Sequence, residues 1–450
     1  MFYRIYSNKD TFITSHQLNN VPRTGSNFGA CEILHVHKQI ESNGSASFGR
    51  ILSYFDITSI AALTASAQAP SASIEYRLKL AHTQHDQAQP SSFDLEIQAV
   101  SQDWDEGKGR DVDFFSDKGV ANWDKAKSNV FWTTVGASGS GPIVKAHFDI
   151  GDENLDVDVT TIVQQWLSGN IPNYGFVIKL SSSLELDTED YYIKMFHARN
   201  THFGDKRPHI EARWNDSMRD DRNNMLYDVT GSLFLYNRVH GEFQNIPGVG
   251  TGSIGIRISD RSGSIKILTG SHTGITGVYS VEFALTTGSY SGSLMTDVWF
   301  NLASTSTSYM SATFTPGSHA GTMNVQPQKY FASITNLKDV YDLEEVPRLG
   351  MYVMPADYNP ARVLTASLDL NGTVITKAYY KIVNDRTDEV VVPFSTGTLE
   401  FTRLSYDQNG NYFKIYMNTL TSGNVYRILF LFDVDGQRQY IDQGHKFRVV

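Results

Sequence analysis

The stretch Asp156 to Leu180, DVDVTTIVQQWLSGNIPNYGFVIKL, changes its hydrophobic period halfway along. Alternating valines and aspartates predict a half-buried strand that runs up to Val159. From there Ile162, Val163 and Trp166 follow at the spacing of one helix face. The sequence therefore predicts a short helix with a tryptophan on its apolar face, set between strands.

The limits of this helix are also predicted from the sequence. Asp158 is a suitable N-cap, Gly169 can adopt the left-handed conformation that ends a helix, and Pro172 prevents any continuation. The β-branched run Phe176 to Leu180 then has strand character. We expect about two and a half helical turns in a chain that is otherwise rich in strands.

Composition limits the class of protein. At 450 residues, with 40% apolar and 12% aromatic residues, the chain has material for several cores, and we expect three domains. The formal charge of −10 and a pI near 5.7 argue against a nucleic-acid or anionic membrane surface, which needs clustered Lys and Arg. A protein or glycan partner is expected instead.

Cysteine usage and the N-terminal sequence indicate where the chain folds. Cys31 is the single cysteine, so no intrachain disulfide is possible. The N-terminal residues lack the charged start and apolar core of a signal peptide, and no eighteen apolar residues run together. A virion protein that folds in the host cytoplasm fits these features together with a β-rich, Gly/Ser/Thr-rich composition.

The rest of the chain is expected to be all-β. Short alternating runs such as Ile74 to Leu80 are separated by dense glycine, serine and aspartate turns. The charged segment Trp214 to Asn224 and the proline-containing stretch near residues 343–360 are candidate boundaries. We predict three domains over residues 1–215, 225–345 and 346–450.

The second and third domains are expected to be Ig-like sandwiches. Val278 to Phe283 and Val425 to Phe430 both read V-Y-x-aliphatic-x-F, which is typical of the tyrosine corner of such folds, although a chance match stays open. Two-residue hairpin turns are predicted at Asn371-Gly372, Asn409-Gly410 and Asp435-Gly436. Alternating strands with few lysines, such as Tyr426 to Phe432, are expected at sheet edges that contact partners.

The first 215 residues carry a series of short motifs in a characteristic order. They are Asp10-Thr11-Phe12-Ile13, Asn27-Phe28-Gly29, Arg50 to Ile57, Asp103-Trp104-Asp105-Glu106-Gly107, Ala121-Asn122-Trp123, Trp132 to Gly136, and Arg207 to Ala212. This series resembles the DNRLRE-type domain, with Val135 standing where the family has proline. The family occurs in large bacterial surface proteins and in phage structural proteins.

The resemblance implies a jelly-roll sandwich similar to carbohydrate-binding modules. In such modules the short helix is a lid over one open end of the sandwich. Trp166 is then expected to plug the lid into the core.

Two interpretations of the tryptophan-rich segment stay open. Trp104, Trp123 and Trp132 could form a platform for sugar rings, or they could fill the core and fix a long loop. Asp105 and Glu106, with Asp103, could contribute to a calcium site or belong to a solvated loop, since hard cations need six to eight oxygens. The core and loop readings are favoured, and glycan contact by these residues is the alternative.

Other candidate sites are weaker. His35 and His37 lie two apart on an expected strand and face the same side, which is half of a zinc site. No Cys, His or carboxylate residue lies at a spacing that would complete the site. His82 and His85 are expected to be merely polar. No motif of nucleophilic, metalloprotease or phosphate-binding chemistry appears in a suitable context, so we expect no catalysis, no cofactor and no metal.

These observations favour a non-enzymatic structural protein of a tailed-bacteriophage virion, as a collar or neck, tail, fibre or capsid-decoration component. It is expected to be a homo-oligomer that contacts other virion proteins, and host-surface polysaccharide is a candidate further partner. No nucleic-acid partner and no membrane insertion are expected. The alternatives are a glycan-binding adhesin and an accessory carbohydrate-binding chain of a polysaccharide-degrading enzyme.

Overall fold

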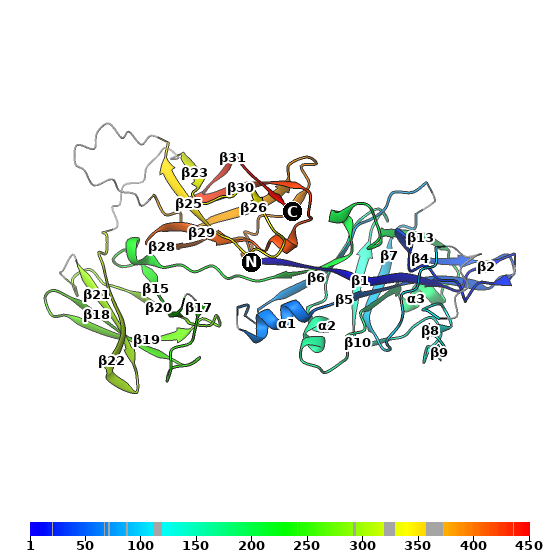
Figure 1. Cartoon of the computed structure of the whole chain (residues 1–450), viewed down its shortest axis with the longest axis horizontal. Helices are drawn as coiled ribbons and strands as arrows, with labels where there is room; N and C mark the ends of the chain where they lie inside the picture. The colour runs from blue at the N-terminus through cyan, green and yellow to red at the C-terminus, as the bar shows by residue number, and fades with distance from the viewer. Residues whose placement is uncertain are drawn as a thin grey trace. The chain divides into compact units, whose positions relative to one another are not determined.

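The computed structural model describes residues 1–19, 21–66, 68–70, 73–86, 89–110, 119–240, 242–290, 294–318, 329–356, 372–434 and 436–450 (Figure 1). These residues are almost entirely β, which confirms the predicted fold class. They form two compact units. One comprises Tyr3–Ala61 and Ile74–Arg213, and the other comprises Met1–Phe2, Ala62–Ser73 and Trp214–Val450.

The elements of the first half of the chain are β1 (Phe2–Thr14), β2 (Gln17–Leu18), β3 (Val21–Pro22), β4 (Ile33–Ile40), β5 (Ala46–Phe55), α1 (Thr58–Ala65), β6 (Glu75–Leu80), β7 (Phe93–Val100), β8 (Lys125–Lys127), β9 (Val130–Phe131), β10 (Gly139–Phe148), β11 (Leu155–Asp158), α2 (Thr160–Leu167), β12 (Phe176–Leu180), α3 (Ser182–Leu186), β13 (Tyr191–His197), a 3₁₀ turn (Gly204–Lys206) and β14 (His209–Arg213). The main strands are hydrogen-bonded in the order β10-β7-β12-β5-β1-β14-β6-β11, with β4 and β13 joined through β5. They make a jelly-roll sandwich.

Helix α2 is the predicted short helix. It buries Ile162, Val163 and Trp166, and the Trp166 ring lies 4.6 Å from the ring of Phe176 on β12. Gly169 has φ +73° and donates its N–H to Trp166 O, so it ends the helix as predicted.

The start of α2 differs from the prediction by one residue. Val159 occupies the N-cap position, and the Asp158 carboxylate accepts the Thr160 N–H at 2.9 Å from the residue before it. Asp158 still satisfies a free N–H at the helix start, because its side chain reaches across Val159.

Two further helices were not predicted. In α1 only Ile60 is buried, and in the five-residue α3 no residue is. Neither helix has a buried face at helical spacing, so hydrophobic periodicity gave no signal. The buried Lys38 side chain instead satisfies the end of α3, where its ammonium donates to the carbonyls of Leu184 and Asp187.

The elements of the second half are a 3₁₀ turn (Asp221–Asn223), β15 (Thr230–Tyr236), β16 (Arg238–Val239), β17 (Glu242–Phe243), β18 (Ile254–Asp260), β19 (Ile265–His272), β20 (Val278–Ala284), β21 (Met295–Asn301), β22 (Ser304–Phe314), β23 (Tyr330–Ile334), β24 (Val340–Tyr341), β25 (Arg348–Pro355), β26 (Ala378–Asn384), β27 (Val390–Val392), β28 (Ser405–Asp407), β29 (Gly410–Lys414), a 3₁₀ turn (Met417–Thr419), β30 (Val425–Val434) and β31 (Gln437–Val449). The first eight strands include a sheet in the order β15-β20-β19-β18-β21-β22. The rest form two sheets, β23-β25-β29-β28 and β24-β31-β30-β26-β27.

Strand β19 connects the two layers of the middle sandwich. It pairs with β18 from Ile265 to Gly270 and then with β20 at Ser271 and His272. A strand that changes partner in this way folds one continuous sheet over a shared core. Trp299, fully buried on β21, lies in that core.

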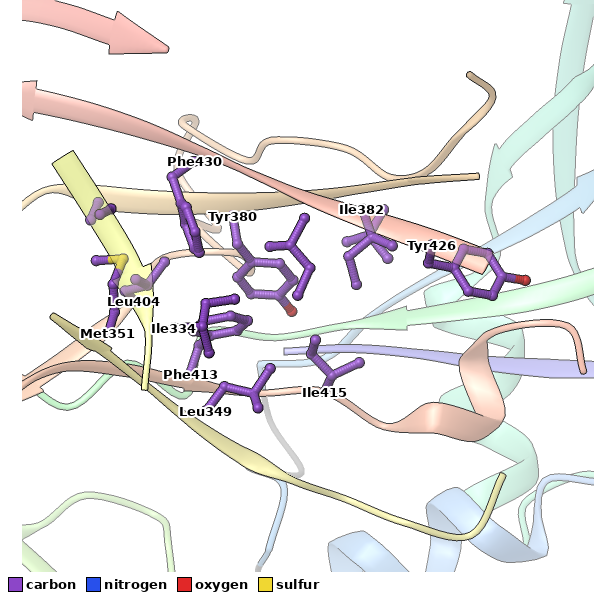
Figure 2. Packing of buried hydrophobic residues seen from close by; sticks show 14 of the residues in the cluster. Ile334, Leu349, Met351, Tyr380, Ile382, Leu404, Phe413, Ile415, Tyr426 and Phe430 are labelled. Atoms are coloured by element: carbon purple, nitrogen blue, oxygen red, sulfur yellow. The ribbon is translucent and has the colours of Figure 1, made fainter. Parts of the chain in front are cut away.

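The last sandwich packs aromatic rings between its two sheets, as Figure 2 shows. The ring of Phe413 on β29 lies 4.9 Å from that of Tyr380 and 5.8 Å from that of Phe430. Strands β23 and β24 pair with β25 and β31, so this sandwich includes residues from Tyr330 onwards. The predicted boundary between 345 and 346 therefore falls inside it.

Both tyrosines of the repeated V-Y motif anchor a preceding loop. The Tyr279 hydroxyl accepts the Ile246 N–H at 3.0 Å and donates to Gly250 O at 2.6 Å. The Tyr426 hydroxyl accepts the Thr421 N–H at 2.8 Å and donates to its carbonyl at 3.0 Å. Both side chains are fully buried, so the shared motif has the same local function in the two sandwiches.

The expectation that Tyr426 to Phe432 forms a sheet edge is wrong. These residues belong to β30, which is hydrogen-bonded to β31 on one side and to β26 on the other. Their few lysines reflect burial in the middle of a sheet, since a central strand must be apolar on its core face.

Two of the predicted hairpin turns connect described strands, although Asp435 of one of them lies outside the described residues. Asp407 pairs with Gly410, which places the connection one residue before the predicted Asn409-Gly410 pair. Val434 pairs with Gln437, and Gly436 between them has φ +77°. Asn371 of the third predicted turn lies outside the described residues. Within the described ranges, no helix has the length and apolar character needed to cross a membrane.

Candidate functional site

The predicted tryptophans lie inside the N-terminal unit. Trp104, Trp123 and Trp132 belong to one buried cluster and are at most 8% exposed. The Trp104 indole N–H donates to Tyr174 O at 2.9 Å, and that of Trp132 donates to Asn122 O at 2.8 Å. With all three side chains buried and the N–H groups of Trp104 and Trp132 paired, these residues hold the long loop in place.

The acidic residues beside Trp104 are paired with cations. Glu106 makes a two-point ion pair with Arg199, both oxygens lying 2.6 Å from guanidinium nitrogens, and accepts the Asp10 N–H at 2.8 Å. Asp103 pairs with Lys127, and the half-exposed Asp105 lies 3.7 Å from the same ammonium. These contacts match a loop fixed by ion pairs, and the described residues contain no group of three or more side chains arranged to hold a metal ion.

The buried carboxyl of Asp10 lies next to this ion pair. Burial, together with the neighbouring Glu106 charge, raises the pKa of Asp10 to about 7, although the Arg199 N–H that it accepts acts in the opposite direction. Asn27, from another of the motifs, donates to the carbonyls of Glu106 and Ala121. The motif residues therefore gather around one loop.

The two histidine pairs lie near each other, since His85 contributes, after burial, to the lowered pKa of His35. Burial lowers the pKa of His35 to about 4 and that of His37 to about 3. The His35 ring stacks on Phe12 at 4.5 Å. His82 lies beside the Lys194 ammonium, with 3.1 Å between the two nitrogens, and burial is the first cause of its lowered pKa. A neutral histidine ring that packs on a phenylalanine or lies beside an ammonium has a structural role.

The segment predicted as the first domain boundary is firmly attached to the second unit. Met218 O accepts the Tyr406 N–H at 2.9 Å, and the Asp220 N–H donates to Tyr406 O at 3.1 Å, so backbone pairing continues beyond β28. The Asp221 carboxylate accepts the Ser232 N–H at 2.7 Å, and Arg222 donates to Phe234 O on β15 at 2.9 Å. Residues 218–222 thus cover the edges of two sheets.

Strand β22 presents a different kind of edge. It ends the six-stranded sheet, and its eleven residues, STSTSYMSATF, contain no charge and no proline. Its side chains are mostly exposed, and within the described residues its backbone partner is β21. Natural sheets usually protect such edges with charge, proline or a covering segment. This strand carries neither charge nor proline, and no strand in the described part of the chain hydrogen-bonds to its outer edge.

A cavity of about 230 Å³ lies within the second unit. Its polar lining residues carry four cations, two carboxylates and several hydroxyl groups: Arg238, Arg348, Arg403, Lys414, Asp216, Asp407, Ser405, Tyr236, Tyr380 and Tyr412. Phe243 and Phe413 add apolar surface. The cavity therefore combines positive charge with hydroxyl groups and aromatic rings.

The cations of this cavity differ in how they are compensated. Arg348 donates to Asp407 at 3.0 Å and stacks 3.6 Å from the ring centre of Tyr412. Arg403 donates to the carboxylate of Glu400 at 2.6 Å. Arg238 lies over the Phe243 ring, and in the described part of the chain neither Arg238 nor Lys414 has a carboxylate within 4.0 Å.

This cavity could not be predicted from the sequence. Its lining residues are spread from Met1 to Lys414 and form no motif. Only the fold brings Arg238, Arg348 and Lys414 to one place, and single arginines and lysines in strands resemble ordinary solvent-facing positions.

Comparisons with known proteins give the chain no family. No family model matches it, and no curated protein matches. Solved structures similar to parts of it include a tetra-tandem repeat from the extending region of a large adhesion protein, at 12% identity over 44% of this chain and 42% of that one, with a TM-score of 0.16. Others are fibronectin(III)-like modules of Clostridium thermocellum CbhA, at 8% identity over 52% and 92% with a TM-score of 0.15, and trypsin-activated alpha-2-macroglobulin from Escherichia coli, at 9% over 84% and 22% with a TM-score of 0.18. The chain thus spans less than half the length of the first, and at these scores none indicates a function.

Proposed function

We propose that this chain is a non-enzymatic structural protein of a tailed-bacteriophage particle. In this proposal it consists of a DNRLRE-type jelly-roll module followed by two Ig-like modules, and it works as one copy in a symmetric homo-oligomer docked on other virion proteins. The motif series of the first 215 residues is what suggests the phage or bacterial-surface setting.

The proposed assembly role is supported by a contrast between covered and uncovered sheet edges in the second unit. Residues 218–222 of the chain itself cover the edges of β15 and β28. By contrast β22 is long, neutral and exposed. An unprotected edge of this kind is suited to backbone pairing with another chain.

Symmetric pairing of two β22 edges is the simplest use of this feature. Antiparallel contact between identical strands has two-fold symmetry and closes on itself. In a larger particle, such dimers or a closed ring would be held by further contacts with neighbouring proteins.

Mass spectrometry of purified particles of the source phage tests the virion assignment. We expect the chain in the particles at a fixed ratio to the portal protein. Its absence from the particles contradicts the assignment, and a variable, substoichiometric amount favours a loosely attached adhesin.

A glycan-binding adhesin is the second candidate function, and one observation favours it. The cavity in the second unit combines cationic, hydroxyl-bearing and aromatic side chains, which is the composition of a polar-ligand pocket. The tryptophans of the first unit do not favour it, because their faces are packed in the core.

A further inference from the structure

The cavity lined by Arg348, Tyr412 and Lys414 has an unusual charge for this protein. The whole chain carries −10, whereas four cationic side chains line the cavity against two carboxylates. Asp407 and Glu400 already compensate Arg348 and Arg403. The half-buried Lys414 has no such partner among the described residues. An anion entering the cavity would therefore find an ammonium that no nearby described carboxylate neutralises.

The other lining groups restrict the kind of anion. Ser405, Tyr236 and Tyr380 line the same space, and their hydroxyl groups are of a kind that can both donate and accept a hydrogen bond, although the Ser405 hydroxyl already accepts the Met218 N–H. Phe243 lines the space with an aromatic ring, one face of which the Arg238 guanidinium covers, and an aromatic ring suits the C–H face of a sugar. A bare inorganic anion would use the charge and the hydroxyl donors but not the aromatic ring, whereas an acidic sugar would use all three.

The size of the cavity sets the size of the ligand. Pockets for drug-sized molecules are commonly about 300 to 1,000 Å³. At about 230 Å³ this cavity is smaller, and it suits one sugar ring at the end of a glycan.

We propose that this cavity binds the carboxylate of a single acidic sugar residue. In this proposal the Lys414 ammonium pairs with the carboxylate. Arg348, which Asp407 and Tyr412 hold in place, lines the cavity beside the bound sugar. This binding site goes beyond the proposed structural role and does not depend on it. A virion component and an adhesin could each use it to contact an acidic polysaccharide.

Isothermal titration of the full chain with D-glucuronate tests the proposal, with D-glucose as the neutral sugar of the same ring and acetate as the small carboxylate. We expect glucuronate to bind and the other two to bind at least about tenfold more weakly, because each lacks one set of contacts. Affinity for glucuronate is expected to fall as salt concentration rises, because the contact depends on charge.

Variants of Lys414 test whether glucuronate binds in this cavity. Lys414→Ala should weaken glucuronate binding by about tenfold or more, and Lys414→Arg should retain most of it, because the charge is kept. Lys446→Ala is the matched control, since Lys446 lies on β31 of the same sandwich and does not line the cavity. It should bind as the unaltered chain does.

Several outcomes would overturn the proposal. One is no detectable binding of glucuronate, and another is equal binding of glucuronate and glucose. Equal binding of acetate would replace the acidic sugar with a general carboxylate site. Unchanged affinity in folded Lys414→Ala would place the ligand elsewhere. Circular dichroism of each variant establishes that a loss of binding is not a loss of fold.

Discussion

The two compact units use the same combination of side chains, cations against aromatic rings, in opposite ways. In the first unit the Arg50 guanidinium lies 5.0 Å from the ring centre of Trp123, and it also makes a two-point ion pair with Glu185. In the second unit Arg348 stacks on Tyr412 at the wall of a cavity, next to Lys414, which has no carboxylate partner among the described residues.

The difference teaches that residue type alone does not identify a binding site. The tryptophans of the first unit, which are the residues most readily associated with sugar binding, are buried in its core. The cavity instead offers tyrosines and a lysine that the sequence does not single out. Burial and charge compensation separate a structural cluster from a site that can take a ligand.

The largest effect expected from this comparison is loss of the α2 anchor. Trp166→Ala should destabilise the first unit by about 3 to 5 kcal/mol, because a buried indole is replaced by a cavity. Denaturant titration of the full chain gives the free energy, and hydrogen exchange should place the change in the first unit only. Phe131→Ala, at a ring that is 64% exposed, is the control and should change stability by less than about 0.5 kcal/mol. A Trp166→Ala loss below about 1 kcal/mol would contradict the anchor role.

Arg50 is expected to give the next effect. Arg50→Ala should cost about 3 kcal/mol, since it leaves the mostly buried Glu185 carboxylate and the Gly136 carbonyl without their donor. Thermal and denaturant unfolding of the variant measure this cost. A change within about 0.5 kcal/mol would mean that the first-unit cation is as dispensable as a surface residue.

Acid sensitivity offers a smaller test of the same contrast. The folded-state pKa of His37 is lowered to about 3 by burial, whereas an unfolded histidine titrates near 6.5. As pH falls below 6.5 the unfolded chain gains a proton that the folded chain does not, so this contribution to stability is complete above 6.5 and declines towards pH 3. Between pH 7.5 and 5 the unaltered chain should therefore lose about 1 to 2 kcal/mol more than His37→Gln. Parallel stability curves for the two proteins would refute this assignment.

The smallest expected effect is at the cavity. Lys414→Ala should change the free energy of unfolding by less than about 0.5 kcal/mol, because its ammonium has no carboxylate partner among the described residues. Differential scanning calorimetry without ligand measures this. A loss comparable to that of Arg50→Ala would make Lys414 a structural residue and remove the contrast between the units.

Local periodicity was enough to predict the all-β class, the position of α2 and its end at Gly169. The two tyrosine anchors were also visible, because Tyr279 and Tyr426 repeat within one short motif. By contrast α3 was missed because five residues with no buried face give no helical period.

Features that depend on strand pairing could not be read from the sequence. The apolar run of β30 was taken for an edge, since a sequence does not reveal how many neighbours a strand has. The second boundary was placed too late, because β23 and β24 are short and pair with strands more than ten residues away. For the same reason the residues that line the cavity could not be grouped before the fold was known.

The most direct test of the central claim is the oligomeric state of the purified full chain, measured by size-exclusion chromatography with light scattering. We expect the unaltered chain to be a homo-oligomer. The double variant Ser311→Lys, Thr313→Lys, which places lysines at exposed positions of β22, should dissociate it, because edge lysines oppose strand pairing. The control Ile143→Lys alters β10, an edge that already carries proline and lysine, and should leave the oligomer intact. A monomeric unaltered chain, or an oligomer that is unaffected by the β22 lysines, would contradict assembly through this edge.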